Sequence, residues 1–171
     1  GDARIVVTGI GDYTGTVTYD VKYVGDLSEA DITGLAEYYE YTGAPVEPSG
    51  IIVKLGNKSL ISGIDYNIAT SGNTSASYKG ANLTVTNASE YYRNSKSENY
   101  SIYYNLASAR LQGPSGETTV PAQAYDGNPK TPLDTYGVYV AGAALTSGSA
   151  YEITYNRNTD VGTASYTITA K

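Results

Sequence analysis

The sequence predicts an all-β fold made of small β-sandwiches, and three observations predict it. Apolar and polar residues alternate in several segments of five to nine residues, which is the pattern of a strand with one buried face. Turn sequences rich in Gly, Asn and Pro, such as TSGNT and YDGNP, separate these segments. Blocks of sequence also recur at a spacing of about 80 residues. Several short strands per repeat, broken by such turns, are typical of a β-sandwich.

The alternating segments give the expected strands and their buried faces. In TVTYDVKYV the inward residues are Val17, Tyr19, Val21 and Tyr23. The residues that alternate with them, Thr18, Asp20 and Lys22, are polar. The same pattern turns three further groups inward: Ile51, Val53 and Leu55; Tyr100, Ile102, Tyr104 and Leu106; and Tyr151, Ile153 and Tyr155. The segment from Asp26 to Leu35 contains the start of the one stretch with a helical pattern, LSEADITGLAEYY, which Thr33-Gly34 weakens. We expect a connector there, with one helical turn at 28–31.

Repeated motifs link distant parts of the chain. YTGAPVEP at 41–48 corresponds to YDGNPKTP at 125–132, and LISGIDYNIATSGNT at 60–74 corresponds to LTSGSAYEITYNRNT at 145–159. A third block begins at Gly1 and recurs from Gly80 and from Gly162. These blocks recur in the same order, which indicates an internal repeat rather than chance similarity.

The repeat divides the chain into three parts. Residues 1–26 match the terminal strand pair of a preceding unit, residues 27–106 match a complete sandwich, and residues 107–171 match a sandwich that lacks its last strand. The shared phase of the alternation predicts nine core residues in the complete sandwich: Ile51, Val53, Tyr66, Ile68, Leu83, Val85, Tyr100, Ile102 and Tyr104. The segment EYYRNSKSEN at 90–99 replaces the shorter DYTGT of the first block. We expect a loop there, either with a role of its own or tolerated as an insertion.

These motifs resemble the tandem immunoglobulin-like repeats of large bacterial cell-surface proteins. The resemblance rests on YTGAPVEP, SGIDY, GNT and GDYTGTVTYDVKYV, and the YDG at 125–127 is similar to a repeat of filamentous adhesins. It covers nearly the whole chain, although its motifs are turn and core residues. The resemblance implies immunoglobulin-like sandwiches arranged end to end, outside a bacterial cell, with a structural function.

The composition argues against several classes of function. The chain has no Cys and no His, which excludes a Ser-His-Asp or Cys-His hydrolase and a zinc site built on sulfur. A net charge of −6 with no basic stripe opposes binding to nucleic acid or to an anionic membrane. No stretch approaches the ~18 apolar residues that a membrane span needs. We expect no enzyme, no cofactor and no membrane insertion in this segment.

Other residue types offer weaker hypotheses. Asn156, Asn158 and Asp160 place oxygen ligands at alternate positions, as a Ca²⁺ loop does, but a turn explains them better. An isopeptide crosslink would need an inward lysine, and Lys22 and Lys54 both lie on the polar side of their alternation. Five Asn-x-Ser/Thr triplets start at Asn57, Asn73, Asn82, Asn87 and Asn99, and they matter only in a host that glycosylates them.

The tyrosines allow a structural and a binding hypothesis. With no Phe or Trp in the chain, the tyrosines of the alternating segments serve as bulky core residues. Five tyrosines outside the alternation are the candidates for contact with a glycan or a host protein: Tyr38, Tyr39, Tyr91, Tyr92 and Tyr103. An adhesin module that uses them is the alternative to a purely structural repeat.

The two ends of the sequence predict pairing with other copies. Incomplete units expose strand edges and half a core, so other copies would complete them head to tail, either as covalent neighbours or by strand donation. Because Gly162 to Lys171 matches Gly1 to Ile10, two equivalent strands would compete for one position in a simple donation. The residues expected in the pairing are Ile5, Val7, Val17, Tyr19, Val21, Tyr23, Tyr166 and Ile168. The predicted function is a segment of an extracellular rod, stalk or filament.

Overall fold

The computed structural model describes residues 2–171 and shows an all-β chain, in which the helical residues lie in short 3₁₀ turns. Contacts between residues group the chain into two compact units. The first unit contains Gly1–Tyr39, Glu47–Asn73 and Ser77–Ile102, and the second contains Glu40–Val46, Thr74–Ala76 and Tyr103–Lys171.

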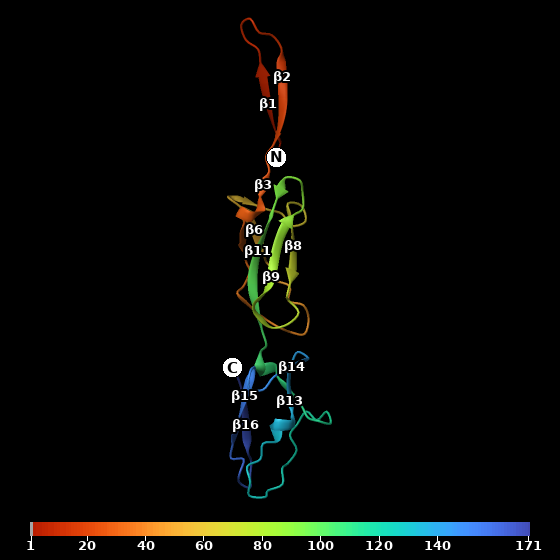
Figure 1. Cartoon of the computed structure of the whole chain (residues 1–171), viewed down its shortest axis with the longest axis vertical. Helices are drawn as coiled ribbons and strands as arrows, with labels where there is room; N and C mark the ends of the chain where they lie inside the picture. The colour runs from red at the N-terminus through yellow and green to blue at the C-terminus, as the bar shows by residue number, and fades with distance from the viewer. Residues whose placement is uncertain (1) are drawn as a thin grey trace. The chain divides into compact units, whose positions relative to one another are not determined.

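The first two strands of the first unit form an antiparallel hairpin, drawn in red and orange in Figure 1. β1 (Asp2–Thr8) pairs with β2 (Thr16–Lys22) over their full length, and the amide of Gly9 donates to the carbonyl of Gly15 to close the turn. Cross-strand pairs share a face, so the pairing puts Ala3, Ile5 and Val7 on the same face as Val21, Tyr19 and Val17. The period of two correctly predicted which residues share this face, but its burial was predicted wrongly: Tyr19 and Tyr23, expected to be core residues, are 59% and 66% exposed. The hairpin has no facing sheet within the described residues to cover them.

Two sheets build the rest of the first unit. One has the order β5-β11-β9-β8, with β5 (Tyr38–Glu40), β8 (Tyr66–Ser71), β9 (Ser77–Asn87) and β11 (Ser95–Tyr103). The other has the order β4-β6-β7, with β4 (Asp31–Thr33), β6 (Ile52–Leu55) and β7 (Lys58–Ser59). A short parallel pair joins β3 (Gly25–Asp26) to β10 (Tyr92–Arg93). Fully buried side chains come from both larger sheets, among them Val53 and Leu83, which is consistent with a β-sandwich.

Most of the predicted core residues are buried. Val53, Tyr66, Leu83, Val85, Tyr100 and Ile102 are buried, while Ile51 and Tyr104 are half-buried. Ile68 is 36% exposed, so its prediction was wrong. It lies on the edge strand β8, and the facing sheet has only three short strands to cover a sheet of four.

Two expected irregular segments belong to the sandwich instead. Residues 26–35 contain the 3₁₀ helix η1 (Leu27–Glu29) and strand β4, and Leu27 and Ala30 are both 0% exposed. They are core and not a connector, because the Asp26 side chain caps η1 and turns Leu27 inward. Residues 90–99 are also not a loop, since they form β10 and the first half of β11.

The second unit has two smaller sheets. One has the order β12-β13-β14, with β12 (Arg110–Gln112), β13 (Gly137–Val140) and β14 (Ala143–Leu145). The other is the pair β15 (Tyr151–Asn156) and β16 (Ser165–Ala170). The 3₁₀ helices are η2 (Leu106–Ser108) and η3 (Pro132–Thr135). Leu133, Val138, Val140 and Tyr151 are buried.

Strand registers recur along the chain at the spacing of the repeated sequence blocks. Six pairs of the hairpin, from Ala3↔Val21 to Thr8↔Thr16, correspond to six pairs of β9 with β11. The correspondence is found by adding 78 to the residue numbers of β1 and 79 to those of β2. The six pairs of β8 with β9 correspond in the same way to the six pairs of β15 with β16. Here 85 is added to the residue numbers of β8 and 83 to those of β9. The hairpin is therefore equivalent to β9–β11, and β16 is equivalent to β9.

A turn before the β8 position recurs as well. Gly63 and Gly148 both donate from the backbone amide to a carbonyl three residues later, at 2.7 and 2.8 Å. Their φ angles are +79° and +83°, a conformation that favours glycine. The same residue type is therefore required at both positions for the same reason.

Candidate assembly surfaces

The hairpin carries an exposed apolar face. Ile5 is 52% exposed, Val7 55% and Tyr19 59%, and Val17 is exposed as well. The equivalents of Ala3, Ile5 and Val7 on β9 are Ala81, Leu83 and Val85, and all three are 0% exposed. An apolar face that is core in one copy of the repeat is thus open to solvent in another copy.

Polar contacts hold the hairpin to the rest of the first unit. Lys22 Nζ lies 2.6 Å from Glu90 Oε2 and 5.0 Å from the centroid of the Tyr91 ring, and the Tyr91 hydroxyl donates to Asp2 Oδ2 at 3.2 Å. The hydrogen bond to Glu90 raises the pKa of Lys22, and the hydrogen bond to Asp2 raises the pKa of Tyr91. These contacts lie at the end of the hairpin where Asp2 pairs with Lys22. The face around Ile5 makes none of them and stays exposed.

The second unit is less buried than the first around β16. In the first unit Leu27, Ala30, Ala81, Leu83 and Val85 are 0% exposed. Their equivalents Leu106, Ala109 and Ile168 are half-buried, while Ala164 and Tyr166 are exposed. Burial is retained at the β6 and β8 positions, where Val138 and Tyr151 are as buried as Val53 and Tyr66.

The exposed residues of β16 lie next to the position that β11 occupies in the first unit. In the first unit β9 is flanked by β8 and β11, whereas within residues 2–171 the sheet of β16 contains only β15. The first unit also pairs β5 with β11. The corresponding stretch of the second unit, residues 113–131, contains no strand.

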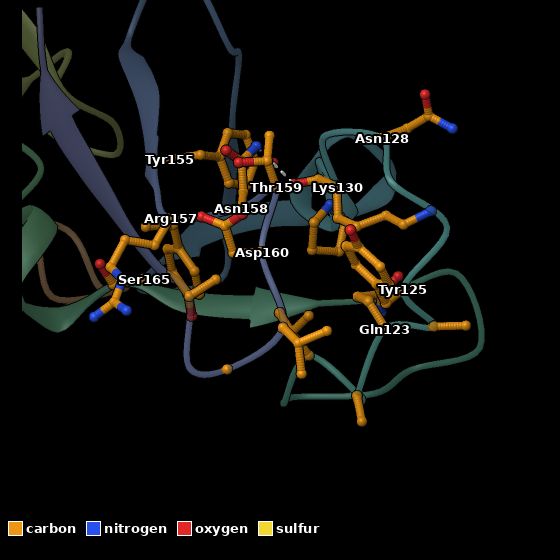
Figure 2. Close-up of a pocket in the computed structure, with 18 of the residues that line it drawn as sticks. Gln123, Tyr125, Asn128, Lys130, Tyr155, Arg157, Asn158, Thr159, Asp160 and Ser165 are labelled. Atoms are coloured by element: carbon orange, nitrogen blue, oxygen red, sulfur yellow. Dashed lines mark hydrogen bonds between the residues drawn. The ribbon is translucent and has the colours of Figure 1, made fainter.

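A pocket of about 450 Å³ opens beside β16 (Figure 2). One wall comes from residues 120–132, including Tyr125 and Lys130, and the other from the turn and strand around Asn158 and Tyr166. The two walls are joined by two hydrogen bonds: Lys130 N donates to Asn158 O at 2.9 Å, and Asn158 Nδ2 donates to Lys130 O at 3.1 Å. Ala164 and Tyr166, the equivalents of Ala81 and Leu83, line the pocket, so it lies next to the position that β11 fills in the first unit.

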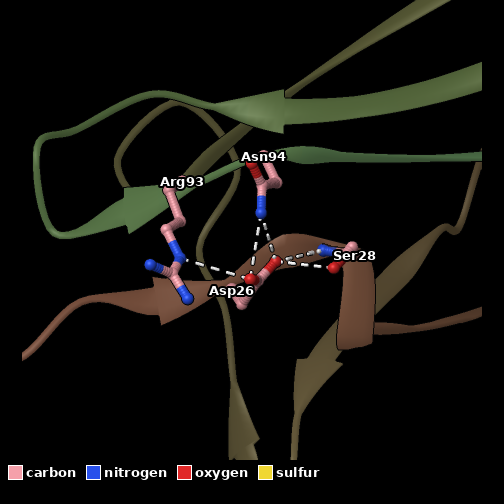
Figure 3. A network of polar contacts seen from close by, with 4 residues as sticks. All are labelled: Asp26, Ser28, Arg93 and Asn94. Carbon is pink, nitrogen blue, oxygen red and sulfur yellow. Dashed lines mark hydrogen bonds and ion pairs between the residues drawn. The ribbon is translucent and has the colours of Figure 1, made fainter.

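A polar cluster around Asp26 fixes the start of β11 in the first unit (Figure 3). The Asp26 carboxylate accepts from Ser28 N and Ser28 Oγ at 3.1 and 2.6 Å, and from Asn94 Nδ2 at 2.9 Å. Arg93 Nε forms an ion pair with it at 3.2 Å. The hydrogen bonds from Ser28 and Asn94, aided by Arg93, lower the pKa of Asp26 to about 2.

The second unit keeps only part of this cluster. Asn105 occupies the position of Asp26 and caps η2 by accepting from the amide of Ala107 at 3.0 Å. Among the described residues of the second unit, none corresponds to Arg93 or Asn94, since these precede β11. The cap is thus retained in both units, and the link to the last strand is present only in the first.

The five candidate tyrosines do not form one site. Tyr38 and Tyr103 are exposed, at 52% and 44%, and lie on the adjacent strands β5 and β11. Tyr39 is half-buried, with its ring 5.3 Å from that of Tyr100. Tyr91 contacts the hairpin, and Tyr92 is only 8% exposed. The expectation that all five lie at the surface was wrong for Tyr92, whose hydroxyl accepts a hydrogen bond from Lys58.

Other candidate positions have structural roles. Asn158 bonds to Lys130, as a turn residue would, and the described residues contain no cluster of acidic side chains suited to a metal ion. Asn73 is 7% exposed and donates to Glu47 Oε1 at 3.0 Å. In the part of the chain that the structure describes, no helix is long and apolar enough to cross a membrane.

Sequence reasoning predicted the shared apolar face of the hairpin and an inward Leu106, but it missed the equivalence of Leu106 to Leu27. The pairing of Tyr166 and Ile168 with another unit stays a prediction, since both pair with β15 of the same chain. A signal for the equivalence of Leu106 to Leu27 was present. Asp26-Leu27-Ser28 and Asn105-Leu106-Ala107 both place a capping side chain before a leucine. Comparison with protein-family models, with curated proteins and with solved structures finds no match for this chain.

Proposed function

We propose that this chain is a segment of a structural array, in which tandem immunoglobulin-like sandwiches are arranged end to end in a rod, stalk or filament outside a bacterial cell. The family and the location follow from the resemblance of the YTG and YDG motifs. The partners are other copies of the same repeat, arranged head to tail. The proposal assigns no catalytic role, in keeping with a sequence that has neither Cys nor His.

Repetition of strand register is the observation that carries the proposal. The same pairs recur between β1–β2 and β9–β11, and between β8–β9 and β15–β16. Equivalent strands with equivalent registers support the view that one module is used more than once. Arrays of one module serve structural and spatial functions because each module mainly contacts its neighbours.

An extended chain tests whether the module is completed by the next strand of an array. Lys171 aligns with Ile10, so a second copy of residues 11–24 placed after Lys171 continues the repeat in register. The added strand is expected to cover Tyr166 and Ile168 and to stabilise the second unit by on the order of 3 kcal/mol, from apolar burial. Urea unfolding measures this change as a higher midpoint for the second unit.

The matched control carries the same extension with the copied Val17, Tyr19 and Val21 changed to Ser. It is expected to unfold at the midpoint of the original chain. Equal midpoints for the two extended chains would contradict the proposal, because the repeat pattern would then have no energetic consequence.

A second candidate function is an adhesin module, favoured by the exposed Tyr38 and Tyr103 on adjacent strands. Exposed aromatic side chains can present a flat apolar surface to a ligand together with a hydroxyl group. Glycan-array binding that is lost in Tyr38→Ala/Tyr103→Ala and kept in Tyr13→Ala would support this function. Tyr13 is 79% exposed in the turn of the hairpin and serves as the control.

A further inference from the structure

We propose that the second unit of one copy takes up the closed β1–β2 hairpin of a second copy, in place of its own β16. The inference rests on the proposed head-to-tail function and names the strands that exchange. The hairpin enters as a preformed equivalent of β9–β11, with β1 beside β15 and β2 in the position of β11.

The exchange preserves the strand pairing. β15 pairs with β16 over six residues, and β1 can pair with β15 in the same register. Ala3 then takes the place of Ala164, Ile5 that of Tyr166 and Val7 that of Ile168. The hairpin stays closed, so its own seven pairs are kept. The exposed ion pair between Lys171 and Glu152, at 3.8 Å, is lost, and exposed pairs of this kind contribute little.

The hairpin also fits the core position better than β16 does. Leu83 occupies this position in the first unit and is 0% exposed, whereas Tyr166 is 41% exposed in the second unit. Ile5 is close to Leu in volume, while a Tyr at a fully packed Leu position would overfill it. β16 is an exposed strand with Ile168 as its one half-buried residue, so little burial opposes its release.

The gain comes from covering the apolar face of the hairpin, which is exposed in a single copy. β2 would place Val21 at the position of Tyr100, beside the pocket.

A second copy is the occupant that the registers specify. The position beside β15 needs a strand with small and branched residues in the order Ala, Leu or Ile, Val at alternate places, joined by a turn to a second strand. In the first unit β9–β11 supplies this pattern, and it is already paired there. The β1–β2 hairpin supplies it with the apolar face exposed.

Two reversible disulfides separate the exchange from other forms of assembly. Thr154 and Thr167 are paired, exposed residues of β15 and β16, and Thr154→Cys/Thr167→Cys locks β16 in place when oxidised. Val6 and Thr18 are the matching pair of the hairpin, and Val6→Cys/Thr18→Cys locks the hairpin closed. Directly paired antiparallel residues lie ~4.5–5.5 Å apart at Cα, within the range that a disulfide bridges.

Sedimentation of the full chain at micromolar concentration gives the result. We expect the unmodified chain to form concentration-dependent oligomers, and oxidised Thr154→Cys/Thr167→Cys to remain monomeric until dithiothreitol is added. Oxidised Val6→Cys/Thr18→Cys is expected to associate as the unmodified chain does.

Three outcomes would overturn the exchange. Association of oxidised Thr154→Cys/Thr167→Cys would show that β16 stays in place, and loss of association in oxidised Val6→Cys/Thr18→Cys would show that the hairpin opens. Both leave the head-to-tail array intact. A chain that stays monomeric in all forms also overturns the exchange, while the extended chain described above tests the array separately.

Discussion

Ile5, Leu83 and Tyr166 occupy one position of the repeat in three different environments. Leu83 is 0% exposed, Tyr166 41% and Ile5 52%. Substitution of Ile5 by Ala therefore tests whether a residue exposed in one copy becomes core in an assembly. Leu83→Ala in the first unit supplies the reference for a fully buried residue at the same position.

The expected magnitudes follow from the exposures. Leu83→Ala removes a fully buried side chain and is expected to destabilise the first unit by about 3 kcal/mol. Ile5→Ala removes a side chain that is half exposed and leaves no closed cavity, so about 1 kcal/mol or less is expected in a dilute, monomeric chain. In the proposed assembly Ile5 is expected to be as buried as Leu83, and the remaining ~2 kcal/mol is expected to appear as roughly 30-fold weaker association.

Two assays on the same variants separate these effects. Urea unfolding at low concentration measures the stability of the single chain, and sedimentation equilibrium measures association. Val6→Ala is the control, because Val6 is 56% exposed on the opposite face of β1 and stays outside the core in either state. The reasoning is refuted if Ile5→Ala associates as tightly as Val6→Ala, or if it destabilises the dilute chain as much as Leu83→Ala does.

Four further predictions concern single features. The pKa of Asp26 is lowered from 3.8 to about 2, so the stabilisation by its carboxylate is full above pH 4 and is lost as the pH falls through 2. Asp26→Asn is expected to remove this dependence of the unfolding free energy on acid pH. An unchanged pH profile in the variant would contradict this. Deletion of residues 163–171 removes the competing strand and is expected to strengthen association in sedimentation, whereas weaker association would show that β16 takes part. The chain extended by residues 11–24 is expected to stay monomeric, because its second unit is already complete, and oligomers of that chain would contradict this. Gly63→Ala and Gly148→Ala are each expected to lower stability by about 1–2 kcal/mol in thermal unfolding, since both residues have a positive φ, and clearly unequal losses would argue against equivalent turns.

Alternation over two residues predicts burial well for strands inside a sheet. β9 and β11 have neighbours on both sides, and Leu83, Val85 and Tyr100 are buried as their pattern indicates. Ile68 follows the same pattern on the edge strand β8 and is exposed. The pattern of one strand carries no information about how far the facing sheet extends.

Contacts between distant residues explain the parts of the fold that the sequence does not predict. Tyr92 is buried because β10 pairs with β3, and the Gly25 amide donates to the Tyr91 carbonyl at 2.9 Å. Leu27 is buried because Asp26 caps η1 and bonds to Asn94 at the same time. Neither contact leaves a local periodic signal.

The candidate site divides in the same way. The apolar face of the hairpin follows from the period of two, and its equivalence to β9–β11 follows from the repeat. The pocket beside β16 could not be predicted, because residues 113–131 have no alternation and its walls meet through contacts between distant residues, such as Lys130 and Asn158.

Amide hydrogen exchange at low and high chain concentration tests most directly whether the hairpin and the second unit are complementary halves of one sandwich. At low concentration we expect slow exchange in β9 and β11 and fast exchange in β2 and β16. As the concentration rises, the amides of β2 are expected to gain protection and those of β16 to lose it, while β9 and β11 stay unchanged. Association without any change in the exchange of β2 and β16 would contradict the account.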